Sequence, residues 1–301
     1  MTQNTITADW IAVDWGTSNL RVWAMASSGT VLAEATSDQG MSQLSRDGFE
    51  PALLALAGDW IDGPTTVIAC GMVGSRQGWV EAPYATVPCA TLPAGLVQAP
   101  THHPDLRVHV IPGIKQTDPA DVMRGEETQI SGFLARNPGW DGVICLPGTH
   151  TKWVHISADE VISFQTFMTG ELFDTISKQT VLRHSIAADG WDEAAFAEGL
   201  DMGLSRPERL AARLFSLRAQ GLLNNLSGAA ARAQLSGLLI GTELAASKPY
   251  WLGQHIAVIG DSSLAKRYVD ALATQAAPAT QVNASAITLA GLTAAYKRLK
   301  G

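Results

Sequence analysis

The segment from Asp14 to Arg21, DWGTSNLR, has the composition of a turn that binds phosphate. Gly16 allows the backbone to approach a ligand closely. Asp14 can hold the water shell of a Mg²⁺ ion, which prefers one or two carboxylates together with phosphate. A plain Asp-Gly hairpin explains the same local pattern equally well. The candidate donors to phosphate oxygens are the hydroxyl, amide and backbone groups of Thr17, Ser18 and Asn19.

A second segment, LPGTHTKW from Leu146 to Trp153, repeats this content far along the chain. Its Lys152 adds a positive charge that can face phosphate or an acidic substrate, although a lone lysine is more often a solvated surface group. Two such turns strengthen each other, because clamping β- and γ-phosphates between two lobes requires one turn on each side. The residues expected to contact phosphate here are Gly148, Thr149 and Thr151.

An acidic cluster, MRGEETQ from Met123 to Gln129, lies between the two turns. A hydroxyl that attacks a γ-phosphate benefits from a carboxylate that orients it and takes its proton, and Glu126 can do so at the start of a helix. The alternative is that Glu126 and Glu127 only stabilise the helix N-terminus through its dipole. Taken alone, the segment favours this alternative, because acidic first turns are common.

A glycine-rich loop, GMVGSRQGW from Gly71 to Trp79, follows an apolar run, and open α/β sheets bind ligands at such strand ends. Arg76 is a candidate for gripping a substrate carboxylate with two parallel hydrogen bonds. A surface salt bridge explains Arg76 equally well.

Two further segments offer weaker signals. The sequence IGDSSL, from Ile259 to Leu264, precedes a helical pattern and can pack on an adenine, but Asp261 as a helix N-cap explains it nearly as well. The run Thr169 to Glu171 suggests a loop that reaches the cleft between the two lobes, or a helix that Glu171 caps. The histidines show no spacing typical of a metal site.

Apolar patterning predicts the elements that position these segments. Residues 10–24 indicate a strand, a tight turn and a second strand, and the pattern recurs from residue 142 onward. The stretch 81–112 is expected to be loop and sheet edge. Further strands are expected at 30–36, 66–72, 107–111 and 255–259, and helices at 48–60, in the second half of 120–135, and at 207–217, 227–239, 264–274 and 286–299.

Composition limits the class of protein. With 301 residues, of which 46% are hydrophobic, the chain is too long for one ordinary core and fits two packed lobes. A net charge of -7 argues against a nucleic-acid partner, which would need clustered Lys and Arg. The three cysteines lack CxxC spacing, and no signal peptide or membrane-length apolar run is recognisable. We expect a cytoplasmic protein that acts on a small molecule and not on a membrane; a homodimer is compatible with these features.

In order and combination, these segments resemble the 2-dehydro-3-deoxygalactonokinase family, and the resemblance runs over nearly the whole chain. It rests on AVDWGTSNLRVW, GMVGSRQGW, VMRGEETQ, PGTHTKWV, MTGEL, SGLLIGTEL and IGDSSLAKRY. It implies an α/β fold of the two-lobed actin-like ATPase or ribonuclease H-like type, with mixed sheets flanked by helices and a cleft between the lobes. It also implies ATP and Mg²⁺ as cofactors, and transfer of the γ-phosphate to the C6 hydroxyl of 2-dehydro-3-deoxy-D-galactonate in galactonate breakdown.

The resemblance also assigns roles to residues. More distantly, GEETQ resembles the Gly-Asp-Gln of glycerol- and xylulose-type kinases, which places the catalytic base at Glu126; Glu127 and Asp121 remain alternatives. The expected catalytic residues are thus Glu126 and Asp14, and Asp14 is the expected metal ligand. Nucleotide contacts are expected from Gly16, Thr17, Ser18, Asn19, Gly148, Thr149, Thr151, Lys152, Gly260 and Ser262, and sugar-acid contacts from Gly74, Ser75, Arg76, Arg124, Glu127 and Glu171.

The expected lobes are residues 1–115, with the first phosphate turn and the sugar-acid contacts, and residues 116–301, with the catalytic acid, the second turn and the adenosine site. Two other functions fit the same segments. One is a kinase for a related acid such as 2-dehydro-3-deoxygluconate. The other is a non-catalytic, nucleotide-dependent sugar-acid sensor, which the acidic Glu126 and the two phosphate turns disfavour.

Overall fold

The computed structural model describes residues 6–260 and 262–301, and for Ser262 the backbone only. The chain forms two compact units. Unit 1 contains the described residues up to Trp140, the segment Ile156–Ser163 and the C-terminal segment Ala284–Gly301. Unit 2 contains Asp141–His155 and Phe164–Asn283. The boundary expected at residues 115 and 116 does not coincide with this division, because residues 116–140 and the C-terminal helix pack with unit 1.

Unit 1 is built on a mixed sheet whose strand order is β3-β2-β1-β4-β8-β7. Strand β1 pairs antiparallel with β2 and parallel with β4, which in turn pairs parallel with β8. A smaller sheet has the order β10-β9-β5. The bounds are β1 Trp10–Trp15, β2 Leu20–Met25, β3 Val31–Ser37, β4 Thr65–Gly71, β5 Tyr84–Thr86, β7 Val97–Gln98, β8 Leu106–Val110, β9 Gly113–Thr117 and β10 Ala120–Met123.

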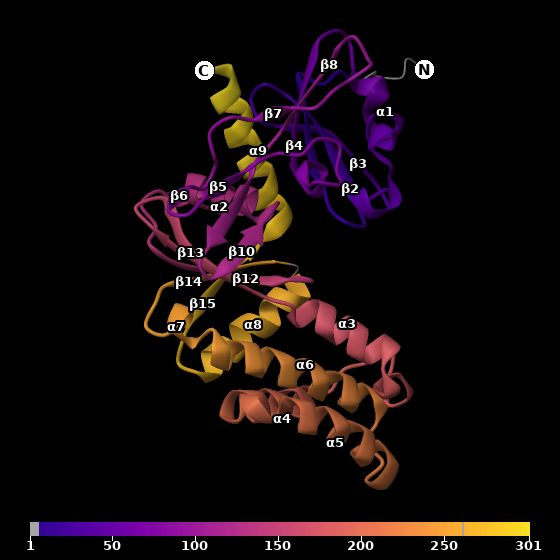
Figure 1. Cartoon of the computed structure of the whole chain (residues 1–301), viewed down its shortest axis with the longest axis vertical. Helices are drawn as coiled ribbons and strands as arrows, with labels where there is room; N and C mark the ends of the chain where they lie inside the picture. The colour runs from indigo at the N-terminus through magenta and orange to yellow at the C-terminus, as the bar shows by residue number, and fades with distance from the viewer. Residues whose placement is uncertain (1–5, 261) are drawn as a thin grey trace. The chain divides into compact units, whose positions relative to one another are not determined.

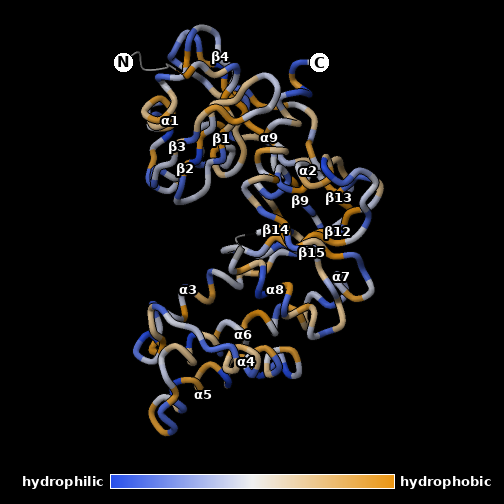
Figure 2. Tube along the Cα trace, turned by 180° about the vertical axis from the view of Figure 1, so that it is seen from behind, coloured by the Kyte–Doolittle hydropathy of each residue, from blue (hydrophilic) through white to orange (hydrophobic). Residues whose placement is uncertain are grey.

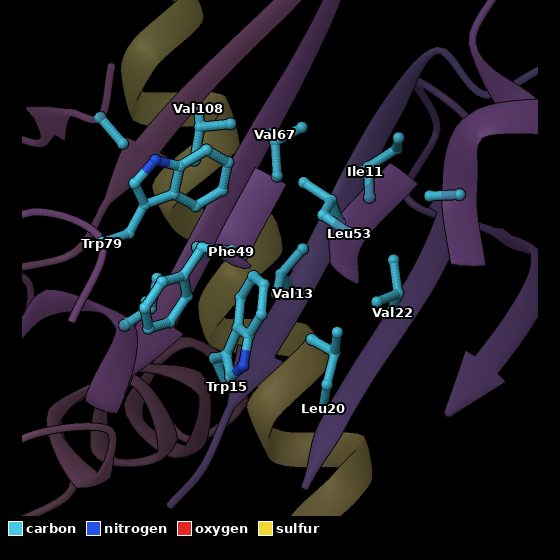
Figure 3. Close-up of a cluster of buried hydrophobic side chains, with 14 of the residues drawn as sticks. Ile11, Val13, Trp15, Leu20, Val22, Phe49, Leu53, Val67, Trp79 and Val108 are labelled. Atoms are coloured by element: carbon cyan, nitrogen blue, oxygen red, sulfur yellow. The ribbon is translucent and has the colours of Figure 1, made fainter. Parts of the chain in front are cut away.

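The alternation of side chains along β1 gives the large sheet two buried faces. Ile11, Val13 and Trp15 belong to the core beneath helix α1 (Phe49–Ala57), where Trp15 lies 4.9 Å from Phe49 between ring centroids (Figure 3). Trp10 and Ala12 belong to the opposite core, which helix α9 (Ala284–Lys300) covers. Figure 1 shows α9 passing beside α2 (Glu126–Arg136), the helix with which it makes its closest crossing.

Unit 2 contains a sheet with the order β15-β14-β11-β12-β13. Apart from the two-residue edge strands β7 and β6 (Cys89–Ala90), the two sheets share one arrangement, 3-2-1-4-5 when the strands of each sheet are numbered in chain order. In both sheets the strands before and after the Gly-Thr turn are neighbours. The end of the β12–β13 hairpin groups with unit 1, where Glu160 and Val161 pair with β6 (Cys89–Ala90). The bounds are β11 Gly142–Leu146, β12 Thr151–Ser157, β13 Glu160–Phe167, β14 Ile256–Gly260 and β15 Ala279–Asn283.

Helices make up the rest of unit 2. In Figure 2 the tube alternates between hydrophilic and hydrophobic colour along α4, α5 and α6, as amphipathic helices do. Their apolar residues pack against the strands, with Phe196 of α4 and Leu244 of α6 in the same core as Val143 and Val258. The bounds are α3 Thr169–Gln179, α4 Glu193–Ser205, α5 Leu210–Leu223, α6 Gly228–Ala246, α7 Lys248–Trp251 and α8 Ser262–Thr274.

The predicted strand, turn and strand at residues 10–24 are confirmed, and so is the strand at 142–146. The helices predicted at 48–60 and 286–299 are confirmed as α1 and α9. The α/β class with mixed sheets is confirmed as well. Strands β9, β10, β13 and β15 were not predicted. Among the described residues, no helix combines the length and the apolar character that crossing a bilayer requires.

Candidate functional site

Asp14 lies at the end of β1 in a row of cross-strand neighbours, with Arg21 on one side and Cys70 on the other. Arg21 Nη2 donates to Asp14 Oδ2 at 2.5 Å, and Arg21 Nη1 donates to Ser285 Oγ at 3.1 Å. The Cys70 thiol approaches Asp14 Oδ1 at 3.8 Å, and burial raises the pKa of this thiol well above its ordinary value. Asp14 is therefore an anchored carboxylate, with 17% of its side chain exposed.

The first Gly-Thr turn is held open by the segment that follows β3. Gly16 N donates to Asn19 O at 2.9 Å, while Met41 N and Ser42 N each donate at 3.0 Å to the carbonyls of Gly16 and Thr17. These hydrogen bonds are accepted by backbone carbonyls of the turn, and the side chains of Thr17, Ser18 and Asn19 remain exposed. Beside the turn lies a cavity of about 640 Å³, lined by Asp14, Gly16, Asn19, Leu20, Arg21, Thr36, Ser37 and Asp38.

Two glycines bring the acidic cluster to this strand end. Gly71 has φ +90°, and a Cβ there would lie 2.6 Å from the carbonyl oxygen of Trp15. Gly125 has φ +110°, and a Cβ there would lie 3.4 Å from Gly71 Cα. Only glycine adopts such backbone angles readily and permits such close approach. The ends of β1 and β4 and the start of α2 therefore meet in unit 1.

The two glutamates at the start of α2 differ in environment. Glu127 is fully buried, and its carboxylate accepts from Gly125 N at 2.7 Å and from the Thr128 hydroxyl at 3.1 Å. Burial, together with the charge of Glu126, raises the pKa of Glu127 to about 7. Glu126 is half-buried and accepts from Arg124 N at 3.0 Å. Both carboxylates thus stabilise the helix start, and Glu126 is the one that solvent reaches.

The glycine-rich loop after β4 is fastened by Arg46, which donates to the carbonyls of Gly78 at 3.3 Å and Arg76 at 3.0 Å. The side chain of Arg76 is exposed, whereas Gly74 and Ser75 are buried. Arg124, the residue before Gly125, donates from Nη2 to the carbonyl of Ala82 at 2.8 Å.

The second Gly-Thr turn, in unit 2, is tied to the start of α3. A Cβ on Gly170 would lie 2.2 Å from Gly148 O, and Glu171 N donates to Thr149 O at 3.0 Å. The carboxylate of Glu171 also contacts His150 Nε2 at 2.6 Å. Thr149 is exposed. The segment Thr169–Glu171 therefore begins α3 and packs against the second turn. The sequence had suggested a loop that reaches the cleft, or a helix that Glu171 caps.

The two residues that end this turn are buried. Thr151 is 1% exposed and its hydroxyl lies 3.1 Å from that of Tyr268; Lys152 is 4% exposed and donates to Thr166 Oγ1 at 3.0 Å. Lys152 is therefore not a solvated surface group. A direct phosphate contact by either side chain stays a prediction, and in the structure both side chains are hydrogen-bonded to other elements of unit 2.

Sequence reasoning missed Glu243 on α6, which is buried under the second turn. Its carboxylate accepts from Trp153 Nε1 at 2.8 Å, from Tyr268 OH at 2.8 Å, and from the Thr169 hydroxyl. Burial raises the pKa of Glu243 to about 7. The available signal was a lone acidic residue in the apolar stretch SGLLIGTEL.

Comparison with known proteins decides the family. Residues 14–295 match the family model described as 2-keto-3-deoxy-galactonokinase. The chain is 41% identical over 297 residues to "Probable 2-dehydro-3-deoxygalactonokinase DgoK1" of Rhizobium meliloti, covering 96% of each protein. It is 34% identical over 290 residues to the 2-dehydro-3-deoxygalactonokinase of Escherichia coli K12, covering 95% of this chain and 97% of the relative. The chain belongs to the 2-keto-3-deoxy-galactonokinase family.

Solved structures agree with this family. A Sinorhizobium meliloti crystal structure described under the same enzyme name aligns with a TM-score of 0.88 at 38% identity, covering 96% of each chain. Component A of the (R)-2-hydroxyglutaryl-CoA dehydratase of Acidaminococcus fermentans aligns at 0.56 with 10% identity, a likeness that shows the fold alone. The expected actin-like sugar-kinase fold is confirmed, and this member of the 2-keto-3-deoxy-galactonokinase family is a phosphotransferase.

Within this family member, the predicted site residues fall into two sets. Unit 1 brings together Asp14, the first turn, the loop at Gly74 and Ser75, and the segment Arg124–Glu127. Unit 2 brings together the second turn, Thr169–Glu171 and Gly260, whose added Cβ would lie 3.3 Å from Pro147 Cδ. Asp261 and the side chain of Ser262 lie outside the described residues. In the part of the chain that is described, three or more His, Cys, Asp or Glu side chains do not gather as a metal cluster.

Proposed function

We propose that this protein transfers the γ-phosphate of ATP to the C6 hydroxyl of 2-dehydro-3-deoxy-D-galactonate, as a step of galactonate breakdown. The observation that carries the proposal is the meeting of Asp14, the exposed Gly-Thr turn and the accessible Glu126 at one end of the sheet of unit 1. The names of the two curated relatives support the choice of sugar acid. A cytoplasmic location and a homodimer remain predictions from the sequence.

Glu126 is the proposed base. It orients the C6 hydroxyl and accepts its proton as the oxygen attacks phosphorus. Two observations favour it over Glu127: Glu126 is accessible, and Glu127 uses its carboxylate on Gly125 and Thr128. The carboxylate of Asp121, the third alternative, accepts a local hydrogen bond from Val122 N at 2.7 Å.

The residues around Asp14 fit a Mg²⁺ ion. Mg²⁺ keeps most of its water and takes one or two protein carboxylates together with phosphate oxygens, so a larger cluster of ligands is unnecessary. Asp14 would hold the hydrated ion, which would supply charge neutralisation on the phosphates. Arg21 fixes the carboxylate of Asp14 in place. The two Gly-Thr turns are the proposed phosphate contacts, and Gly260 and Ser262 are proposed for the adenosine.

An assay of ADP release over a panel of 2-keto-3-deoxy acids tests the proposal. Wild-type protein should turn over 2-dehydro-3-deoxy-D-galactonate faster than its gluconate epimer, and a preference for the epimer would correct the substrate. Binding of both ligands without ADP release would instead identify a sensor.

Glu126→Gln tests the base. We expect kcat to fall by roughly 10²–10⁴-fold, the usual contribution of general base catalysis, while ADP affinity measured by calorimetry stays unchanged. Glu127→Gln is the companion variant. If it loses kcat and Glu126→Gln does not, the base is Glu127.

A further inference from the structure

The side chain of Arg124 is a cation that forms no ion pair with any of the described residues. Its one side-chain hydrogen bond runs from Nη2 to the carbonyl of Ala82. Its Nε and Nη1 atoms are buried and have no hydrogen-bond partner. The hydroxyl of Ser75, a residue that is 5% exposed, is also buried without a partner.

The guanidinium of Arg124 is nevertheless held in a fixed place. It stacks on Tyr84, with Cζ 4.3 Å from the ring centroid. On another side it touches Gly74, where an added Cβ would lie 2.8 Å from Arg124 Nη1 and 2.9 Å from Val110 Cγ1. A larger residue at position 74 would force the guanidinium of Arg124 to shift. Stacking, one hydrogen bond and this close contact therefore aim the cation before any ligand arrives.

Such an arrangement is unfavourable unless an anion completes it. Removing a charged group from water is costly when it lacks a counter-charge, and buried donors without acceptors add to that cost. Ser75, next to Gly74 in the same loop, adds a hydroxyl of the kind that binds a carboxylate oxygen. The unpaired groups come from two segments, the loop after β4 and the corner before α2, so local chain geometry alone does not account for them.

We propose that Arg124 and Ser75 form the subsite for the carboxylate of the sugar acid. The inference rests on the proposed function and extends it, because it says which end of the substrate is recognised and by what. Arg124 lies two residues before Glu126, so an anion held here places the acid end of the substrate in the unit that carries the proposed base. Arg76, the residue that the sequence favoured for this role, is exposed and is not aimed in this way.

Calorimetry without nucleotide tests the subsite independently of turnover. The probes are 2-dehydro-3-deoxy-D-galactonate and its carboxamide, which lacks the charge. Wild-type protein should bind the acid more tightly than the amide. Arg124→Met should weaken binding of the acid by roughly 10–100-fold, the range expected for lost hydrogen bonds to a charged group, and should leave binding of the amide within about threefold. Arg107→Met, an exposed arginine of the same unit, is the matched control.

The outcomes separate the two proposals. If wild type binds the acid and Arg124→Met keeps the full preference for acid over amide, the subsite is wrong while the kinase function stands. It is also wrong if Arg76→Met abolishes the preference, or if Arg124→Met weakens ADP and not the acid. Should wild type bind no sugar acid, both proposals fail. If Arg124→Met does not fold, Ser75→Ala is the second variant: weaker binding of the acid alone supports the subsite, and unchanged binding contradicts it.

Discussion

At the scale of single residues, the site of unit 1 depends on a close approach of two strand ends that only glycine permits. We expect Gly71→Ala to lower the free energy of unfolding by about 3 kcal/mol, because a methyl group would meet Trp15 O at 2.6 Å and the backbone angle φ is +90°. Gly63 has nearly the same angle, φ +89°, with open space around its Cβ position. Gly63→Ala therefore measures the backbone strain alone, about 1 kcal/mol.

Urea unfolding of both variants checks this prediction. The difference between them isolates the contact with the Trp15 carbonyl. Equal losses in the two variants would mean that β1 and β4 can separate freely, and that the position of Glu126 relative to Asp14 does not depend on Gly71.

The residues of the site were predictable to the extent that their chemistry is local. Gly16 and Thr17 lie in the predicted turn between two strands, and Glu126 begins a helix as predicted. A turn or a helix start depends on a few consecutive residues, so the sequence pattern is enough to predict it. The burial of Thr151 and Lys152 was not predictable, since it depends on Tyr268 and Thr166, which no local pattern links to the turn.

At the scale of elements, Glu243 joins α6 to three other elements under the second turn, through Trp153 on β12, Thr169 on α3 and Tyr268 on α8. Glu243→Leu fills a similar volume but leaves these donors without an acceptor, at about 1–3 kcal/mol each. We expect a loss of about 3 kcal/mol in urea unfolding. Ser236→Ala, a buried position on the same helix, should lose less than about 1 kcal/mol. A Glu243→Leu variant as stable as wild type would show that these bonds do not hold the elements together.

Whole elements were predictable where burial imposes a pattern on the sequence. The strands β1 and β11 are buried on both faces, so nearly all of their residues are apolar. The helix α9 is buried along one stripe, so its apolar residues recur at helical spacing. Strand β15, with the sequence ATQVN, does not, because its residues are half-buried or exposed and it forms through pairing with β14. Its place at the sheet edge comes from tertiary contacts.

At the scale of the whole molecule, the prediction of two lobes rested on the recurrence of a strand, a Gly-Thr turn and a second strand, and each unit contains these elements. The prediction covered neither the strand order of the two sheets nor the return of the C-terminal helix to unit 1. Helix α9 returns from the end of unit 2 to pack on α2, where a Cβ on Gly132 would lie 2.0 Å from Ile287 O. The only local sign of this contact in the sequence is one glycine in each helix, Gly132 in α2 and Gly291 in α9. A glycine alone does not reveal which distant helix packs against it.

Among the residues that the structure describes, burial raises the pKa of two carboxyl groups from 4.5 to about 7, Glu127 in unit 1 and Glu243 in unit 2. In the unfolded chain these groups lose their protons near pH 4.5, whereas in the folded protein they keep them to about pH 7. Folding is therefore favoured at low pH, and the free energy of unfolding should fall as pH rises from about 5 to 7, by up to about 3 kcal/mol per group. Above that window the contribution is gone and the dependence levels off.

Glu243→Gln isolates one of the two contributions, because the amide keeps the shape and does not titrate. Between pH 5 and 7 the free energy of unfolding, measured with urea, should fall less steeply with pH in this variant than in wild type. From pH 7 to 8 the difference between the two proteins should stay constant. Subtracting the curves removes the opposite effect of His109, whose pKa burial lowers and which both proteins share. Parallel curves would mean that Glu243 is already ionised at pH 5 in the folded protein, and that its three donors outweigh the cost of burying its charge.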